Sequence, residues 1–328
     1  LDVLLAAAGG AGRVQQVAVT GPLGRRRLAR LGWIGPDHAV VEMAEAAGLR
    51  LLGTRRDPLR ATSRGAGELI LAALDGGARR ITVGVGGSAS TDGGAGILTA
   101  LGARLADSSG SPVPPGGGAL AAIASVDLSG VDRRLRLTQV EVAVDVRCPL
   151  FGRQGAAHVF AAQKGAGAAE VGRLDAGLRH LAALLERAAG LTGLAGHPGA
   201  GAAGGAGFAL AALGARLTGG AALVCDRVGL DAALSGAALV ITGEGRLDEQ
   251  TAAGKAPAEV AGRARGAGVP CVAVAGSVGG GSELFTAAIA LDRLGDDPRR
   301  RVRVLLRLAG AGAVATARAA RPGRWDQA

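Results

Sequence analysis

Hydrophobic residues recur along the chain at two spacings, one typical of strands and one typical of helices. Valine occupies every second position from 140 to 146, which predicts a strand over 139–146 with one apolar face. Unbroken apolar runs at 238–242 and 269–275 are bounded by Gly or Pro, the pattern of parallel strands buried on both faces. Shorter runs predict further strands at 16–20, 39–43 and 80–85.

The helical spacing is clearest between residues 174 and 185. Five leucines there fall on one face and predict an amphipathic helix over 175–189. Further helices are predicted at 68–74, 207–217, 257–266 and 301–319. Strands that alternate with helices indicate an α/β protein with a largely parallel sheet.

Composition narrows the class of protein. Of 328 residues 58 are Gly and 48% are hydrophobic, so the chain is too apolar for a disordered protein, and its glycines lack the period of collagen. The longest stretch free of charged side chains, between Arg187 and Arg216, is broken by nine glycines, a proline and His197, which does not suit a membrane span. We therefore expect a soluble protein with room for two domains and no membrane partner.

The net charge of +10 would by itself suggest a nucleic-acid partner. However, 35 of the 37 basic residues are Arg, they are scattered, and the only lysines are Lys164 and Lys255. We favour a solvated basic surface and keep nucleic-acid binding as the alternative. Three widely spaced cysteines and the absence of a signal-like start predict reduced thiols and a cytoplasmic location.

A glycine-rich segment with hydroxyl and carboxyl groups follows the predicted strand at 80–85. Its glycines allow a ligand to approach the backbone, and successive N–H groups can line an anion site. The following helix would add its positive N-terminal end. The alternative is a tight structural turn in a glycine-rich chain. The predicted cofactor-binding residues of this segment are Gly86, Gly87, Ser88, Ser90, Thr91 and Asp92, and Asp92 could hold a metal or accept a proton.

Two chemical groups follow the alternating strand. Asp145 stands at its carboxyl end, where ligand-handling groups gather in α/β sheets. Lys164 follows, and its compact ammonium suits a phosphate where space is tight. A surface lysine is the alternative reading. A glycine-rich stretch at 197–207 is either a second anion site or a hinge.

The densest group of polar residues lies directly after the apolar run at 238–242. Two carboxylates, an arginine and a lysine beside a glycine turn suit a metal–phosphate site with an anionic co-substrate. Helix capping is the alternative. The candidates are Glu244, Arg246, Asp248 and Lys255, with Gln250 and Thr251 between them.

With these motifs the chain resembles the bacterial type I glycerate kinases. The matching stretches run in the family's order and include 20–24, 42–49, 67–70, 84–96, Asp145 with 149–150, 160–165, 198–207, 241–255 and 272–276. The loop after Gly84 and the segment ending at Lys255 are the most specific. The family's opening segments have no counterpart before Leu1, so we expect an N-terminally truncated member.

The resemblance implies a two-domain α/β fold, one domain Rossmann-like and the second inserted into it. Residues 9–230 would form the inserted domain, and 1–8 with 231–328 the remainder of the Rossmann-like one. It also implies ATP- and Mg²⁺-dependent phosphorylation of D-glycerate to 2-phosphoglycerate, with 3-phosphoglycerate as the other product that we keep open. A homodimer is left open as well.

From residue chemistry we assign roles within that activity. The glycine-rich loop and Lys164 would bind nucleotide phosphates, and Asp145 and Asp248 would hold Mg²⁺ or orient the attacking hydroxyl. Arg246 would pair with the glycerate carboxylate, and Lys255 would neutralise the transferred phosphoryl group.

Two alternatives to an active kinase remain. One is a catalytically impaired truncated homologue. The other is a nucleotide-binding oxidoreductase, whose GxGxxG pattern is not cleanly present because position 89 is Ala.

Overall fold

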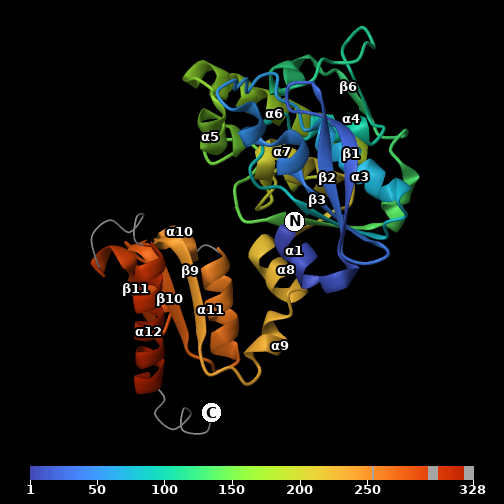
Figure 1. Ribbon diagram of the computed structural model, residues 1–328. Coiled ribbons are helices and arrows are strands. Elements are labelled where there is room, and N and C mark those ends of the chain that lie inside the picture. The colour runs from blue at the N-terminus through green and yellow to red at the C-terminus, as the bar shows by residue number, and fades with distance from the viewer. Residues whose placement is uncertain (253–254, 295–301, 321–328) are drawn as a thin grey trace. The chain divides into compact units, whose positions relative to one another are not determined.

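The computed structural model describes residues 1–252, 255–294 and 302–320. The chain divides into two compact units, Leu1–Gly220 and Ala221–Ala328, and each is described by itself (Figure 1). Both units combine strands and helices, which confirms the predicted α/β class. The domain bounds expected from the sequence stay a prediction: one domain of residues 9–230, and a second made of residues 1–8 and 231–328.

The first unit is built on a mixed sheet whose described strands run in the order β1-β2-β3-β4-β7-β8. The pairs β1–β2 and β2–β3 are antiparallel, whereas β3, β4, β7 and β8 are parallel neighbours. A separate antiparallel ribbon joins β5 to β6. The strands are β1 (Arg13–Thr20), β2 (Arg26–Trp33), β3 (His38–Glu42), β4 (Arg80–Gly84), β5 (Arg104–Ala106), β6 (Ser125–Asp127), β7 (Gln139–Val144) and β8 (Arg216–Gly219).

Two hydrophobic cores hold this unit together. One lies between the sheet and helices α2, α3, α4 and α7, and includes the fully buried Trp33 and Met43. The other lies among α5, α6, α7 and a short helical segment at Gly117–Ala122, around Phe208. The helices are α1 (Asp2–Ala7), α2 (Met43–Ala47), α3 (Arg64–Asp75), α4 (Ala95–Ala100), α5 (Ala156–Phe160), α6 (Ala168–Ala189) and α7 (Ala202–Ala212).

Most elements predicted for this unit are present, with shifted ends. Helix α6 begins seven residues earlier than predicted, because the Glu170 carboxylate accepts the Gly167 N–H at 2.8 Å and so caps its start. The helix predicted at 207–217 is wrong in its second half. Gly214 takes a φ of 93° and ends the helical segment, and the following residues form β8 beside β7.

The second unit contains a parallel sheet whose described strands follow the order β11-β10-β9. Alternate residues of β10 face different helices: Ala273 packs with α11, whereas Val274 packs with α12. These two helices therefore cover opposite faces of the sheet (Figure 1). The elements are α8 (Gly220–Arg227), α9 (Leu230–Leu234), β9 (Val240–Leu247), α10 (Glu249–Ala252), α11 (Ala256–Gly266), β10 (Cys271–Val278), β11 (Ala287–Ala290) and α12 (Val302–Ala320).

One burial prediction for this unit is correct and the other is wrong. Residues 271–275 of β10 are buried, as an unbroken apolar run predicts. Strand β9 was predicted to be equally buried, but Ile241 is 49% exposed. The reason is position, since β9 pairs on one side only and forms an edge of the described sheet.

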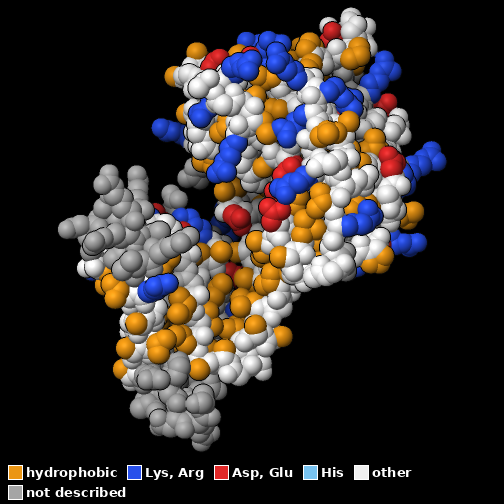
Figure 2. Space-filling model, viewed as in Figure 1, with side chains coloured by type: hydrophobic (Ala, Val, Ile, Leu, Met, Phe, Trp, Pro, Cys, Tyr) orange, Lys and Arg blue, Asp and Glu red, His pale blue; other side chains and the backbone are white. Residues whose placement is uncertain are grey.

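Surface features complete the picture. Figure 2 shows basic side chains spread over the visible face of the first unit, with acidic side chains between them. The three cysteines are free thiols. Among the described residues, no helix combines the length and the apolar character that crossing a bilayer requires.

Candidate functional site

A pocket of about 290 Å³ lies at the carboxyl ends of β4 and β7 in the first unit. Of the residues predicted from the sequence, it brings together Gly86, Gly87, Ser88, Asp145 and Lys164. We call it the lysine pocket. Its lining is completed by Leu49, Val85, Ala143, Val146, Phe160, Gln163, Ala202 and Ala203.

The loop after β4 is held in place by backbone bonds to the end of α2 and the residues after it. Leu49 N donates to Gly87 O at 2.8 Å, and Ala89 N donates to Ala47 O at 2.8 Å. Gly87 has a φ of 66°, a conformation that favours glycine. The loop is therefore a fixed wall of the pocket.

Lys164 is the central charged group of the lysine pocket. It is 2% exposed, and its Nζ donates to Ser88 Oγ at 3.0 Å and to the Ser90 carbonyl at 2.5 Å. Burial lowers the pKa of Lys164 to about 8, while the charges of Asp92 and Cys148 oppose that shift. In the described residues no carboxylate forms an ion pair with Lys164. A cation so placed can bind an anion that enters the pocket.

Asp92 does not line the pocket, although the sequence predicts it as a cofactor-binding residue. Its side chain is fully buried and accepts five hydrogen bonds, from Thr62 Oγ1, from N and Oγ of Ser63, and from the N–H groups of Gly94 and Gly96. Burial raises the pKa of Asp92, and these hydrogen bonds oppose the rise. The structure thus places Asp92 as an anchor that ties the start of α3 to the start of α4.

Ser90 and Thr91 are also predicted cofactor-binding residues that lie behind the pocket wall. Both are fully buried, and Ser90 contributes its carbonyl, not its hydroxyl, to Lys164. Among the described residues, neither Ser90 Oγ nor Thr91 Oγ1 has a hydrogen-bond partner. Of the predicted hydroxyl donors, only Ser88 lines the pocket.

Asp145 follows β7, as predicted, and packs closely against the end of β8. A Cβ added at Gly220 would lie 2.7 Å from Asp145 Oδ1, so glycine is required there for the observed carboxylate position. Another lining residue, Ala203, is strained, because its φ is 53°. Gly204 and Gly205 follow it with positive φ, which glycine adopts without strain. Strain such as that of Ala203 costs about 1–3 kcal/mol and concentrates at functional sites.

The second unit brings together one residue of β9 and three that follow it, which we call the carboxylate cluster: Glu244, Asp248, Thr251 and Lys255. The Lys255 ammonium lies 3.5 Å from Glu244 Oε2 and 3.6 Å from Asp248 Oδ1. Thr251 Oγ1 donates to Glu244 Oε1 at 2.5 Å and accepts the Asp248 N–H at 3.1 Å. Thr251 in the first turn of α10 thereby accepts the N–H of the preceding Asp248, as in one half of a capping box, and also fixes the Glu244 carboxylate.

Arg246 is exposed on β9, beside the loop after β10. A Cβ added at Gly279 would lie 3.5 Å from one of its guanidinium nitrogens. Within the described residues, no group of three or more His, Cys, Asp or Glu side chains lies close enough to hold a metal by itself. Of the polar residues predicted after the apolar run at 238–242, only Gln250 has a side chain outside the described residues.

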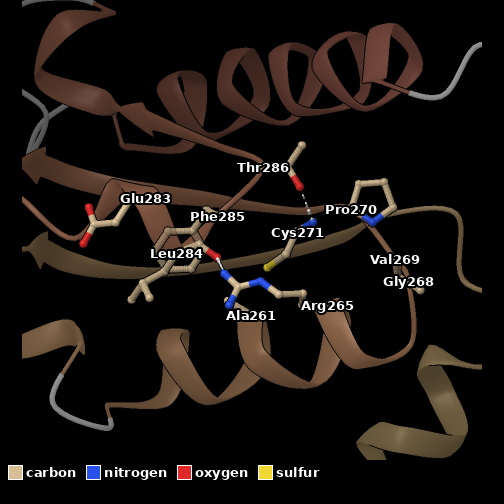
Figure 3. A pocket seen from close by; sticks show the side chains of 10 residues that line it. All are labelled: Ala261, Arg265, Gly268, Val269, Pro270, Cys271, Glu283, Leu284, Phe285 and Thr286. Atoms are coloured by element: carbon tan, nitrogen blue, oxygen red, sulfur yellow. Dashed lines mark hydrogen bonds between the residues drawn. The ribbon is translucent and has the colours of Figure 1, made fainter.

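A larger pocket of about 340 Å³ lies at the other end of the second sheet, around the start of β10 (Figure 3). Arg265 donates to the Leu284 carbonyl at 2.8 Å, and Cys271 N donates to Thr286 Oγ1 at 3.0 Å. Burial raises the pKa of Cys271 to about 11, which favours the protonated thiol at neutral pH. The predicted polar residues of this unit lie at the other end of the sheet, in the carboxylate cluster.

Sequence reasoning missed several lining residues of the lysine pocket. Leu49, Phe160 and Ala203 carry no reactive group, so residue chemistry gave no reason to choose them. All three fall inside stretches that the family resemblance covers, 42–49, 160–165 and 198–207. The positive φ of Ala203 has no marker in its residue type.

Comparison with known proteins gives a consistent result. The glycerate kinase family model matches residues 1–292. The chain is 49% identical over 269 residues to a Bacillus subtilis glycerate kinase, covering 81% of this chain and 70% of that protein. It is 45% identical over 280 residues to an Escherichia coli glycerate 2-kinase, covering 85% and 73%.

Solved structures show the same likeness. A crystal structure of a Salmonella typhimurium LT2 protein assigned as glycerate kinase 2 superposes with a TM-score of 0.77 at 46% identity, over 88% of this chain and 76% of that one. This confirms the predicted two-domain α/β fold class. The chain belongs to the glycerate kinase family and is a kinase, a phosphotransferase that acts on an alcohol group.

Proposed function

We propose that this chain transfers the terminal phosphoryl group of ATP to D-glycerate and forms 2-phosphoglycerate. The observation that carries the proposal is the lysine pocket, where a buried cation, Lys164, lies beneath a fixed glycine loop beside Asp145. Phosphoryl transfer depends on positioning and on neutralising charge, and this pocket supplies both.

The first unit would bind the nucleotide phosphates. The backbone at Gly86 and Gly87 allows close approach of an anion, and the Ser88 hydroxyl is available as a further donor. Lys164 would give its charge to the phosphate chain. An incoming phosphate would replace the weaker partners of Nζ, the Ser88 hydroxyl and the Ser90 carbonyl.

The second unit would act on the acceptor and on the transferred group. Arg246 is exposed and its guanidinium fork matches the glycerate carboxylate. Lys255 would neutralise the transferred phosphoryl group. Glu244, a predicted cofactor-binding residue, holds Lys255 and Thr251 in place in the structure.

The donor set fits Mg²⁺ as kinases use it. That ion usually takes one or two protein carboxylates, with water and substrate phosphates completing its shell, so a three-residue protein cluster is not required. Asp145 in the first unit and Asp248 in the second are each a candidate carboxylate ligand. Mg²⁺ would supply charge neutralisation on the phosphate oxygens.

We further propose that the two sites serve a single reaction and that 9–230 forms a domain inserted between 1–8 and 231–328. The single reaction is supported by chemistry, because the first unit offers groups for a nucleotide and the second offers groups for an acid and a phosphoryl group. The domain bounds rest on the family resemblance. A cytoplasmic enzyme without a nucleic-acid partner fits this proposal, and light scattering would distinguish a monomer from a homodimer.

A coupled assay tests the proposal. With D-glycerate and Mg·ATP, enolase and pyruvate kinase report 2-phosphoglycerate directly, whereas 3-phosphoglycerate needs added phosphoglycerate mutase. We expect a signal without the mutase. Asp248→Asn and Lys255→Ala should each lower kcat at least tenfold, because each removes a charge from the carboxylate cluster.

The matched control is Asp292→Asn, an exposed carboxylate of the second unit outside the cluster, which should keep the parent rate. Unchanged kcat in both cluster variants would remove the cluster from the mechanism. A parent that binds ATP but forms no product would instead identify a catalytically impaired homologue.

A further inference from the structure

A second pocket in the first unit, of about 480 Å³, is lined by five arginines and no acidic residue. We call it the arginine pocket. About one residue in nine of the whole chain is Arg, whereas half of this lining is. Its ten lining residues are Gly21, Pro22, Leu23, Arg25, Arg26, Arg27, Leu51, Leu52, Arg55 and Arg60.

Most of this positive charge is not neutralised by the protein. Arg26 lies 3.7 Å from Glu68 and donates to the Ala18 carbonyl, which uses part of its guanidinium. In the described residues, by contrast, no carboxylate forms an ion pair with the side chain of Arg25, Arg55 or Arg60. Like charges gathered around one cavity raise its affinity for anions.

The backbone that carries these arginines is fixed by hydrogen bonds. In the β1–β2 turn, Gly21 N donates to Arg25 O at 2.7 Å. Thr62 N donates to Pro22 O at 2.9 Å and ties this turn to the segment that carries Arg60. Arg55 N donates to Leu52 O at 2.9 Å. Arginines on three fixed segments need little rearrangement to meet an anion, which reduces the cost of binding.

The arginine pocket is separate from the lysine pocket, because no residue lines both. The two share only a short helical segment, Leu49–Leu52, whose first residue lines the lysine pocket and whose last two line the arginine pocket. The arginine pocket also has an apolar part, formed by Pro22, Leu23 and the two leucines.

We propose that the arginine pocket binds a small molecule that carries a diphosphate or triphosphate group. Several guanidinium groups can each engage a phosphate in a bidentate fashion, and a chain of two or three phosphates offers enough oxygens for them. A nucleic acid is the less favoured occupant, because the lining offers no aromatic side chain on which a base could stack.

Isothermal titration calorimetry with inorganic probes tests this. We expect affinity to rise from orthophosphate to pyrophosphate to tripolyphosphate and to fall with added salt. The double variant Arg25→Gln/Arg60→Gln should weaken pyrophosphate binding at least tenfold. The matched control, Arg133→Gln/Arg136→Gln, removes two exposed arginines elsewhere in the first unit and should bind as the parent does.

A second pair of measurements separates this site from the proposed active site. Lys164→Ala should keep pyrophosphate binding at the arginine pocket, whatever its effect on phosphoryl transfer. ADP and phosphoribosyl pyrophosphate then distinguish a nucleotide from a sugar diphosphate as the source of the phosphates.

Three results would overturn the proposal. One is equal pyrophosphate binding by the pocket and control variants when both melt at the parent temperature. Another is loss of all pyrophosphate binding in Lys164→Ala. The third is an oligonucleotide that binds more tightly than tripolyphosphate and displaces it.

Discussion

The two lysines of the chain occupy opposite environments in the two units. Lys164 in the first unit is 2% exposed, and within the described part of the chain its ammonium donates to one hydroxyl and one carbonyl. Lys255 in the second unit has a side chain 36% exposed and lies between the carboxylates of Glu244 and Asp248. One is a desolvated cation, and the other belongs to a hydrated ion-pair network.

This difference indicates different tasks. A desolvated, unpaired ammonium destabilises the protein until an anion arrives, so its presence is best explained by binding. An ammonium already paired with two carboxylates destabilises the protein little. It becomes available to bind an anion when those carboxylates bind a metal or a hydroxyl group instead. The predictions below challenge that contrast, from the largest expected effect to the smallest.

The largest effect is expected from Lys164→Ala. Loss of the buried cation should lower kcat/KM for ATP by about 100-fold or more, in the range seen when one fixed donor to a reacting anion is removed. Lys164→Arg should not restore the rate, because a planar guanidinium does not fit where a compact ammonium is enclosed. Steady-state kinetics measure both, and an arginine variant with half the parent rate would contradict the account.

Burial of Lys164 should also appear in the pH dependence of stability. Its pKa is about 8 in the native protein and near 10.5 in the unfolded chain, so the unfolded state binds more protons between these values. The free energy of unfolding of the parent should therefore rise by about 3 kcal/mol, relative to Lys164→Met, from pH 8 to pH 10.5.

Urea unfolding measures this difference. Trp33 is fully buried in the first unit and reports its unfolding when Trp325 is replaced by Phe in both proteins. A constant difference between parent and variant across this pH range would mean that the Lys164 ammonium is not desolvated.

The next effect concerns Asp145, the carboxylate that lines the lysine pocket. In Gly220→Ala the new Cβ would lie 2.7 Å from Asp145 Oδ1, so the carboxylate must move. We expect kcat to fall roughly tenfold, since small displacements of positioned groups are costly in catalysis. Gly172→Ala is the control, because nothing lies within 4 Å of its Cβ position. Parent-like kcat in Gly220→Ala would show that Asp145 is not held for catalysis.

A smaller effect is expected at the strained wall of the lysine pocket. Ala203→Gly removes the Cβ from a residue with a φ of 53°, which should stabilise the first unit by about 1 kcal/mol. If the strain serves the site, KM for ATP should rise at the same time. Urea unfolding and kinetics on one preparation check both, and a loss of stability would show that the Ala203 methyl group packs usefully.

The smallest change is expected for the stability of Lys255→Met. Its ion pairs are partly hydrated, so the free energy of unfolding should change by less than about 1 kcal/mol while kcat falls. A large destabilisation, measured by urea unfolding of the second unit, would assign Lys255 a structural role and erase the contrast with Lys164.

The sequence predicted individual polar residues of the lysine pocket better than it predicted the packing around them. Lys164 stood out because the chain otherwise uses Arg, and Asp145 because it ends an alternating strand. The sequence did not show that Asp92 lies behind the lysine pocket, because a carboxylate among glycines suits both a ligand and a buried anchor. Its hydrogen bonds depend on the position of the Thr62–Ser63 segment. Long-range packing of that kind leaves no trace in local sequence.

Secondary structure was likewise predicted where the local pattern is strong and missed where distant residues decide. Strong local patterns gave β7, β10 and the body of α6. Strand β8 was missed because its few residues become a strand only by pairing with β7. Strand β2 was missed because its arginines look like a surface run, although its other residues pack into the core.

Lysine-selective ¹³C NMR tests the central claim most directly, because the chain contains only two lysine side chains. Labelling both Cε atoms gives two signals, assigned by the Lys164→Arg and Lys255→Arg variants. The account predicts that the Lys164 signal titrates near pH 8 in the free protein. It also predicts that Mg²⁺ with a non-hydrolysable ATP analogue and D-glycerate shifts both signals and raises the pKa of Lys164. A signal from either lysine that stays unchanged at saturating ligand would contradict it.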